Sequence, residues 1–174
     1  RPPCSAPRKA LMLDAALKEG VSLSVDDRGV AYLTFAHPRS NSLPGAVLAD
    51  LAASVRELGQ RSDVKVVVLG SAGDRAFCAG ASFDELVAIS DEEAGLAFFM
   101  GFAHVINALR SIPQLVIGRV QGKAVGGGVG VAAATDYCLA TQHAAIKLSE
   151  LAVGIGPFVV GPAVERKLGV SAMS

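Results

Sequence analysis

Hydrophobic positions along the chain follow two spacings in turn, and they predict strands and helices in alternation. Residues 21–25 and 30–35 are largely apolar and flank a polar DDRG stretch, a pattern typical of a β-hairpin. Residues 44–59 carry apolar side chains at helical spacing, with Pro44 suited to the first turn. The nearly all-apolar run 64–69 predicts a strand covered on both faces. Strand, helix and strand in this order predict a crossover unit and a partly parallel sheet.

The pattern continues on both sides of this unit. Residues 10–19 predict a short helix ahead of the hairpin, ending at a glycine. Asp91 is a candidate N-cap for a second long helix, and residues 115–120 predict another buried strand. The second helix carries one apolar stripe, which we interpret as core packing: Phe99, Phe102, Ala103, Ile106 and Leu109.

Two loops of small residues each connect a predicted strand to a predicted helix. One ends in FCAGAS at residues 77–82, and the other, GKAVGGGVG, spans residues 122–130. A run of glycines costs backbone entropy, so it indicates positive φ or a close approach of the backbone to another group. A helix that begins at such a loop presents bare N–H groups, which favour negative charge.

Composition excludes several classes of protein. A chain of 174 residues that is 51% hydrophobic and 18% charged forms one globular domain with a core of its own. Sixteen basic and sixteen acidic residues cancel, which argues against a nucleic-acid-binding surface. No apolar run reaches membrane-spanning length, so no membrane partner is expected. Three scattered cysteines predict neither a disulfide framework nor a zinc site and indicate a reducing, cytoplasmic location.

Common catalytic motifs fit the chain poorly. Residues 128–133 match the dinucleotide fingerprint, with Glu150 at about the expected distance, but residues 121–125 separate it from its strand. The Gly-Lys pair at 122–123 lacks the phosphate-loop spacing, and the three histidines lack metal-ligand spacing, so no metal is predicted. Ser82 does not lie in a nucleophile elbow.

Five motifs in a fixed order carry a family resemblance. They are PRSNSL at 38–43, AFCAGA at 76–81, VQGKAVGGG at 120–128, TD at 135–136, and KLSEL at 147–151 followed by GIG at 154–156. Together they resemble the crotonase, or enoyl-CoA hydratase/isomerase, superfamily. The resemblance implies an α/β fold built as a spiral of ββα units, with residues 1–20 as a tail or short helix and 21–174 as the core domain.

The family resemblance also implies an activity and a site. Its members are lyases or isomerases that act on acyl-CoA thioesters, in fatty-acid or related metabolism, through an enolate held in an oxyanion hole. The two N–H donors would be Ala81 and Gly127. The residues implied to bind the substrate or its CoA are Ala79, Gly80, Ala81, Ser82, Phe83, Asp84, Gly126 and Gly127. Coenzyme A is then part of the substrate, and no separate cofactor is expected.

Departures from the family pattern narrow the expected chemistry. Hydratases of the family use two glutamates, and Glu150 matches the second, whereas Gly130 stands at the first position. One glutamate is enough to shuttle a proton between carbons, so isomerisation fits better than simple hydration, which would need another group to position the water. The alternative is a non-catalytic CoA-binding or assembly homologue. Trimers or dimers of trimers are expected, although a C-terminal helical segment of the family is missing or truncated within these 174 residues.

Overall fold

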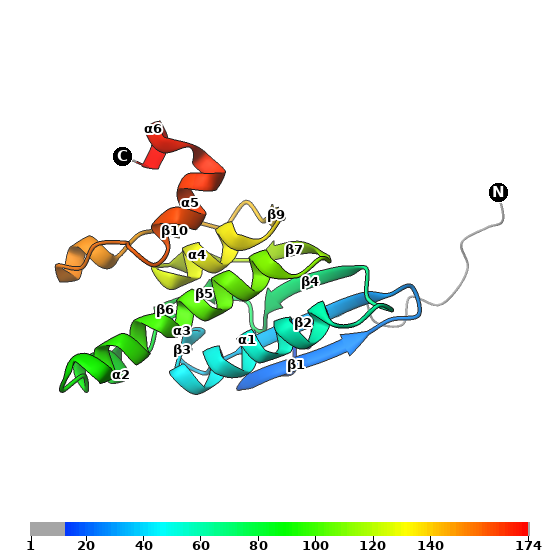
Figure 1. Cartoon of the computed structure of the whole chain (residues 1–174), viewed down its shortest axis with the longest axis horizontal. Helices are drawn as coiled ribbons and strands as arrows, with labels where there is room; N and C mark the ends of the chain where they lie inside the picture. Colours follow the sequence, from blue (N-terminus) through cyan, green and yellow to red (C-terminus); the bar gives the residue numbers. More distant parts are fainter. Residues whose placement is uncertain (1–12, 174) are drawn as a thin grey trace.

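The computed structural model describes residues 13–173. Its largest sheet has five strands (Figure 1). The predicted hairpin is present, with β1 (Gly20–Val25) antiparallel to β2 (Val30–Ala36). Three further strands add in parallel, in the order β1-β2-β4-β7-β9: β4 (Val66–Ser71), β7 (Leu115–Val120) and β9 (Tyr137–Ala140). The predicted crossover unit and partly parallel sheet are therefore confirmed.

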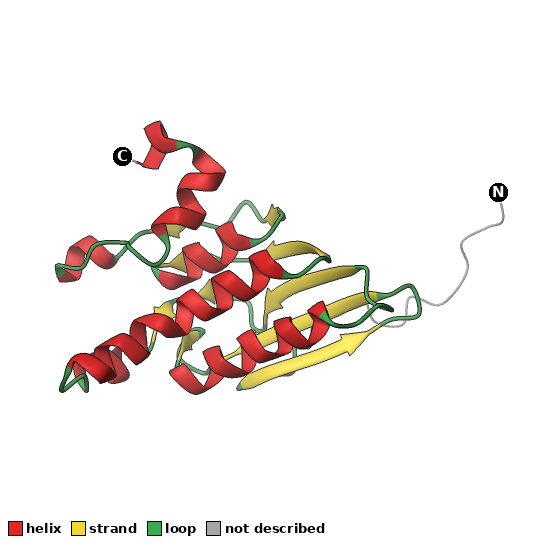
Figure 2. Ribbon diagram, viewed as in Figure 1, coloured by secondary structure: helices red, strands yellow, loops and turns green. Residues whose placement is uncertain are grey.

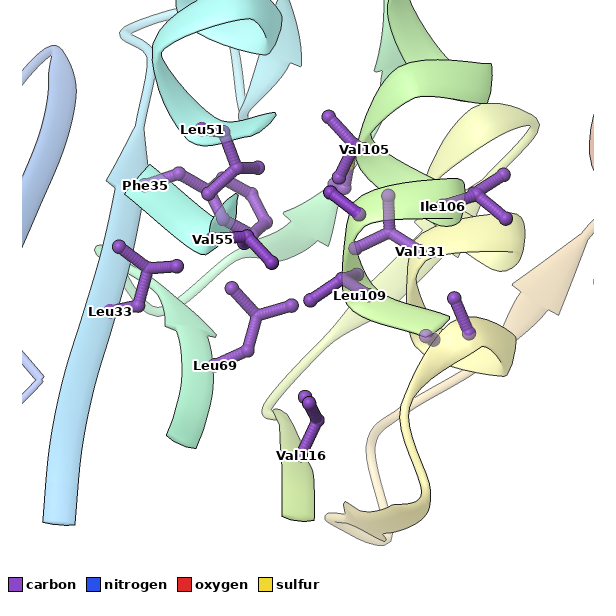
Figure 3. Packing of buried hydrophobic residues seen from close by; sticks show 14 of the residues in the cluster. Leu33, Phe35, Leu51, Val55, Leu69, Val105, Ile106, Leu109, Val116 and Val131 are labelled. Atoms are coloured by element: carbon purple, nitrogen blue, oxygen red, sulfur yellow. The ribbon is translucent and has the colours of Figure 1, made fainter. Parts of the chain in front are cut away.

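Two long helices lie across one face of this sheet (Figure 2). They are α1 (Gly45–Gly59) and α3 (Glu92–Ser111), which pack on each other. The Asp91 side chain accepts a hydrogen bond from the backbone N–H of Ala94 at 2.8 Å, which confirms the predicted cap. Between helices and sheet lies a core that includes Leu33, Phe35, Leu51, Val55, Leu69, Val105, Leu109 and Val116 (Figure 3).

The interpretation of the α3 stripe as core holds for only part of it. Phe102, Ile106 and Leu109 are buried, as expected. Phe99 is 37% exposed because it lies one turn nearer the helix start, where α3 extends past the sheet and borders a cavity. Its role is therefore different from core packing.

A second group of short elements lies at one end of the sheet. β5 (Ala76–Cys78), β8 (Lys123–Val125) and β10 (Ile146–Lys147) form a parallel three-stranded sheet, while β3 (Ser42–Leu43) pairs with β6 (Gly80–Ala81). Between and after them lie α2 (Phe83–Val87), α4 (Gly127–Ala134), the 3-10 segment η1 (Glu150–Val153), α5 (Gly161–Leu168) and α6 (Val170–Met173). These short strands place the two small-residue loops side by side.

The predicted helix at 10–19 is not formed in its described part. Residues 13–19 make a turn, and residues 10–12 lie outside the described range. Leu13 is buried, and its Cδ1 lies 2.1 Å from the point where a side chain on Gly70 would begin. The N–H of Asp14 donates to Thr34 Oγ1 at 2.9 Å. These contacts with β2 and β4 hold the segment against the sheet and override its helical pattern. Among the helices of residues 13–173, none has the length and apolar character needed to cross a bilayer.

Candidate active site

The two small-residue loops meet at one cavity of about 280 Å³. The loop between β5 and α2 and the loop before α4 both contribute backbone to it, and η1 closes one side. In Figure 1, α2 and the orange segment after β10 lie at this same end of the molecule. The lining residues are Ser42, Ala79, Gly80, Ala81, Phe83, Leu86, Phe98, Phe99, Phe102, Gly126, Gly127, Ser149, Glu150, Val153, Ile155, Gly156, Pro157, Val159 and Val160.

Asn41 fixes the position of the first loop. Its backbone is left-handed, with φ 58°, and its side chain is buried. The side-chain amide donates to the carbonyls of Ala72 at 3.0 Å and Ala76 at 2.9 Å, and the side-chain oxygen accepts from the N–H of His37 at 2.8 Å. The N–H of Ala79 in turn donates to the Asn41 carbonyl at 3.1 Å. One residue of the PRSNSL motif therefore holds the loop of the AFCAGA motif.

Gly80 brings the backbone of this loop to the cavity wall. Its φ is 95°, and a side chain there would begin 3.2 Å from the carbonyl oxygen of Val125. Glycine takes this conformation without strain, and a side chain there would be in tight contact with β8. The next residue, Ala81, pairs with Leu43 across β6 and β3, and its carbonyl accepts from Ser42 Oγ at 2.8 Å. Ala81 is thus held rigidly where it lines the cavity.

The second loop presents the start of α4 to the same cavity. Gly126 has φ 52° and donates its N–H to the Lys147 carbonyl at 2.9 Å. Gly127 is the first helical residue, so its N–H has no acceptor within the helix and lies at the positive end of the helix dipole. A side chain on Gly127 would begin 2.6 Å from the ring of Phe102. The backbone is therefore exposed to the cavity on one side and packed against α3 on the other.

Glu150 supplies the carboxylate of the cavity. It begins η1, and its Oε1 lies 3.5 Å from the point where a side chain on Gly126 would start. Its Oε2 is buried and has no hydrogen-bond partner within residues 13–173. A buried polar atom without a partner is costly to a fold, so it is normally satisfied by water or a ligand or retained for a function. Glu150 therefore brings to the cavity one carboxylate oxygen that no described residue hydrogen-bonds.

Apolar packing disfavours a second carboxylate at position 130. Gly130 is buried in α4, where a side chain would begin 2.6 Å from Val160 Cγ1 and 2.7 Å from Ile106 Cδ1. Both distances are far shorter than carbon contacts allow, so apolar atoms already fill this space. Of the described residues that line the cavity, Glu150 alone carries an ionisable side chain.

Two residues predicted to contact CoA lie outside the cavity lining. Ser82 caps α2, its hydroxyl accepting from the N–H of Glu85 at 3.4 Å. Asp84 forms an exposed ion pair with Arg39. The neighbouring Glu85 accepts from the N–H of Gly45 at 2.9 Å and so caps α1. Contact of Ser82 or Asp84 with CoA stays a prediction, whereas the other predicted binding residues all line the cavity.

The aromatic wall of the cavity was missed by sequence reasoning. Phe98 and Phe99 on α3 meet edge to face, with ring centroids 5.2 Å apart, and both line the cavity with Phe102. Because Phe99 fits the helical apolar stripe, periodicity alone assigns it to the core. Phe98 falls beside the predicted stripe and widens the apolar face of α3 at this point, and this was the available signal.

Other reactive groups do not supply the chemistry. Burial raises the pKa of the Cys78 thiol to about 12, so it is no thiolate nucleophile at neutral pH. In the part of the chain that the structure describes, no three His, Cys, Asp or Glu side chains gather so as to hold a metal ion. The arrangement therefore offers the backbone of Ala81 and Gly127, one carboxylate and an apolar enclosure.

Sequence comparison places most of the chain within one family. The model of the enoyl-CoA hydratase/isomerase family matches residues 26–174. A curated relative, ethylmalonyl-CoA decarboxylase of Gallus gallus, is 30% identical over 138 residues, which are 79% of this chain and 46% of the relative. The chain spans about half the length of the curated relatives it matches.

Solved structures agree with the sequence comparison. An enoyl-CoA hydratase from Mycobacterium smegmatis has a TM-score of 0.82 at 33% identity, covering 88% of this chain and 60% of that one. An enoyl-CoA hydratase from Bacillus anthracis has a TM-score of 0.82 at 27% identity, covering 89% of this chain and 60% of that one. The crotonase-like α/β fold predicted from the sequence motifs is thereby confirmed.

Proposed function

Because the chain belongs to the enoyl-CoA hydratase/isomerase family, we propose that it moves a proton along an acyl-CoA thioester, with Glu150 as acid and base. The backbone N–H groups of Ala81 and Gly127 hold the thioester oxygen while it carries negative charge. The observation that carries this proposal is the meeting of both loops and Glu150 at one cavity.

The physical basis is charge stabilisation by fixed donors. Removal of a proton from the carbon next to a thioester carbonyl places negative charge on the carbonyl oxygen. Donors that are already oriented do not reorganise as this charge develops, and each contributes about 3 to 4 kcal/mol of barrier lowering. Asn41, Gly80 and the Ser42 hydrogen bond hold Ala81, while Phe102 packs behind Gly127. The small residues let the thioester lie against this backbone.

A single carboxylate favours double-bond isomerisation. Glu150 takes a proton from C2 of a 3-enoyl thioester, and the electron pair forms a dienolate whose oxygen the two N–H groups hold. Glu150 then returns the same proton to C4, and the double bond moves from C3–C4 to C2–C3. No water is consumed, which fits the apolar packing of Val160 and Ile106 at position 130, where family hydratases carry their other glutamate.

Relatives with other reactions share this intermediate. The Gallus gallus relative is named a decarboxylase, and loss of CO₂ from the carbon next to a thioester also leaves an enolate. The Mycobacterium smegmatis structure is named a hydratase. Two alternatives to isomerisation remain for this chain. One is a lyase reaction like those of such relatives, and the other is binding of CoA without any turnover. Assembly into trimers is a separate expectation, to be measured by light scattering.

The test is an isomerase assay with a 3-enoyl-CoA, followed by the absorbance of the conjugated 2-enoyl product. Glu150→Gln keeps the size of the side chain but removes its proton transfer, so we expect a loss of about 10² to 10⁴ in kcat. Glu93→Gln in α3 is the control, because it removes the same negative charge from an exposed position. This variant should retain full activity. Unchanged turnover in Glu150→Gln would refute the assignment. Calorimetric binding of an acyl-CoA without any turnover of the wild type would favour the non-catalytic homologue.

A further inference from the structure

We propose that this site accepts an uncharged acyl group and discriminates against an acyl group that carries its own carboxylate. The inference rests on the proposed acyl-CoA function and adds the substrate class. It separates the chain from relatives whose substrates are carboxylated.

The described residues that line the cavity carry negative charge and no positive charge. Glu150 lines it with a buried oxygen that no group in residues 13–173 hydrogen-bonds. Among the described lining residues there is no lysine, arginine or histidine to offset this charge. Arg39 lies nearby in sequence to the lining residue Ser42, but it is ion-paired with Asp84 and is not part of the lining. A second carboxylate inside the cavity would therefore meet a like charge and no cation.

With the two N–H groups taken by the thioester oxygen, the rest of the wall cannot solvate a second anion. Phe98, Phe99 and Phe102 form an aromatic side, and Val159 and Val160 add aliphatic surface. A carboxylate moved from water into such surroundings loses its hydration and gains no equivalent hydrogen bonds. The Ser149 hydroxyl beside Glu150 is neutral, so it can supply one hydrogen bond without compensating the charge.

The two effects act together on one step, which is binding of the acyl group. Two unit charges a few ångströms apart repel strongly enough, at the effective dielectric constant of a protein site, to weaken binding by more than about tenfold. An uncharged acyl group of the same shape avoids the repulsion and gains contact with the phenylalanines. Selection between the two classes therefore depends on Glu150 itself, the same group that is proposed to move the proton.

The experiment compares isobutyryl-CoA with methylmalonyl-CoA by calorimetry, because these thioesters differ only in a carboxylate that replaces a methyl group. For the wild type we expect Kd for methylmalonyl-CoA to exceed that for isobutyryl-CoA by about tenfold or more. In Glu150→Gln the ratio should fall to about threefold or less, since the like charge is gone. In the control Glu93→Gln the ratio should stay as in the wild type. Phe99→Lys, at a partly exposed wall position, should also lower the ratio by supplying a cation.

Several results would overturn the inference. One is equal affinity of the wild type for both thioesters, and another is a wild-type ratio that persists in Glu150→Gln. Release of CO₂ from methylmalonyl-CoA by the wild type would contradict it directly. Failure of the proposed isomerisation is distinguishable, because discrimination in binding can be intact while the isomerase assay shows no turnover. If neither thioester binds, this inference is wrong, and the isomerase assay alone decides the proposed function.

Discussion

Gly127→Ala tests whether the second loop is held in position by α3. The new side chain would begin 2.6, 2.6 and 2.7 Å from Phe102 Cδ1, Cγ and Cδ2. Carbon atoms in contact normally lie about 3.5 to 4.0 Å apart, so the loop and the ring must separate by about 1 Å. Phe102 is buried in the core and cannot swing away freely. Most of the movement should therefore appear at Gly127.

The expected effect on catalysis is large and the effect on stability is small. A displacement of about 1 Å in a catalytic group lowers the rate by about 100-fold, and complete loss of one oxyanion donor lowers it by about 10² to 10³. Overpacking destabilises by about 1 to 3 kcal/mol, of which the helix propensity of alanine recovers up to about 1 kcal/mol. We expect kcat of the isomerase assay to fall about 100-fold, with unfolding in urea showing a loss of about 2 kcal/mol or less.

Rescue by a second change separates this mechanism from general damage. Phe102→Ala removes all three clashing atoms, so the double variant Gly127→Ala/Phe102→Ala should regain about tenfold in kcat over Gly127→Ala, corrected for the fraction folded. That correction matters because Phe102→Ala alone removes about 3 to 5 kcal/mol of stability. Gly95→Ala is the control, since its side chain would meet Ile89 Cγ2 at an ordinary 3.6 Å. Activity of Gly127→Ala within threefold of wild type, or no gain in the double variant, would refute the reasoning.

Three further predictions concern the elements that hold the site. Gly128→Ala should lose more than about 2 kcal/mol in urea unfolding, because its side chain would begin 2.6 Å from the Cys78 carbonyl oxygen, a backbone atom; a neutral result would contradict this packing. Asn41→Ala should lose about 3 kcal/mol or more by the same measurement, since buried hydrogen-bonding groups stay unpaired; a loss under about 1 kcal/mol would be inconsistent. The hydrogen bond from the N–H of Ala94 is the largest cause that lowers the pKa of Asp91, so the cap stabilises above the ordinary aspartate pKa of about 3.9 and weakens below it. The advantage of wild type over Asp91→Ala should therefore shrink between pH 7 and pH 3 in thermal unfolding, and an advantage that is constant with pH would argue against the cap.

The local pattern of hydrophobic residues was sufficient to predict the long helices and strands of the fold. The hairpin, α1, β4, α3 and β7 each have enough residues to show a period, and they were predicted within a few positions. The strands β5, β6, β8 and β10 have two or three residues each, often glycine or alanine, and carry no measurable period. Their pairing depends on contacts with segments distant in the sequence, such as Ala81 with Leu43. Such contacts cannot be read from a local window.

The candidate site, too, could be predicted from the sequence only in part. The glycine runs stand out in the sequence by their composition, whereas Glu150 was singled out by the family resemblance. The structure brings both to one cavity. Ser82 and Asp84 directly follow the AFCAGA motif, yet Ser82 caps α2 and Asp84 forms an ion pair with Arg39, both outside the cavity lining. Phe99 was interpreted as a core residue but lines the cavity, because α3 extends past the sheet at this position.

Position 130 shows most clearly what packing adds to a motif. The sequence reveals a glycine where family hydratases carry a glutamate, but a glycine alone is compatible with either an open space or a filled one. In the structure Val160 and Ile106, from segments on either side of α4 in the sequence, reach the point where its side chain would begin. A carboxylate introduced there would be buried among apolar atoms, which is strongly unfavourable. The single-carboxylate character of the site is therefore built into the contacts of α4 with α3 and the start of α5, and one substitution at Gly130 would not restore a second acid.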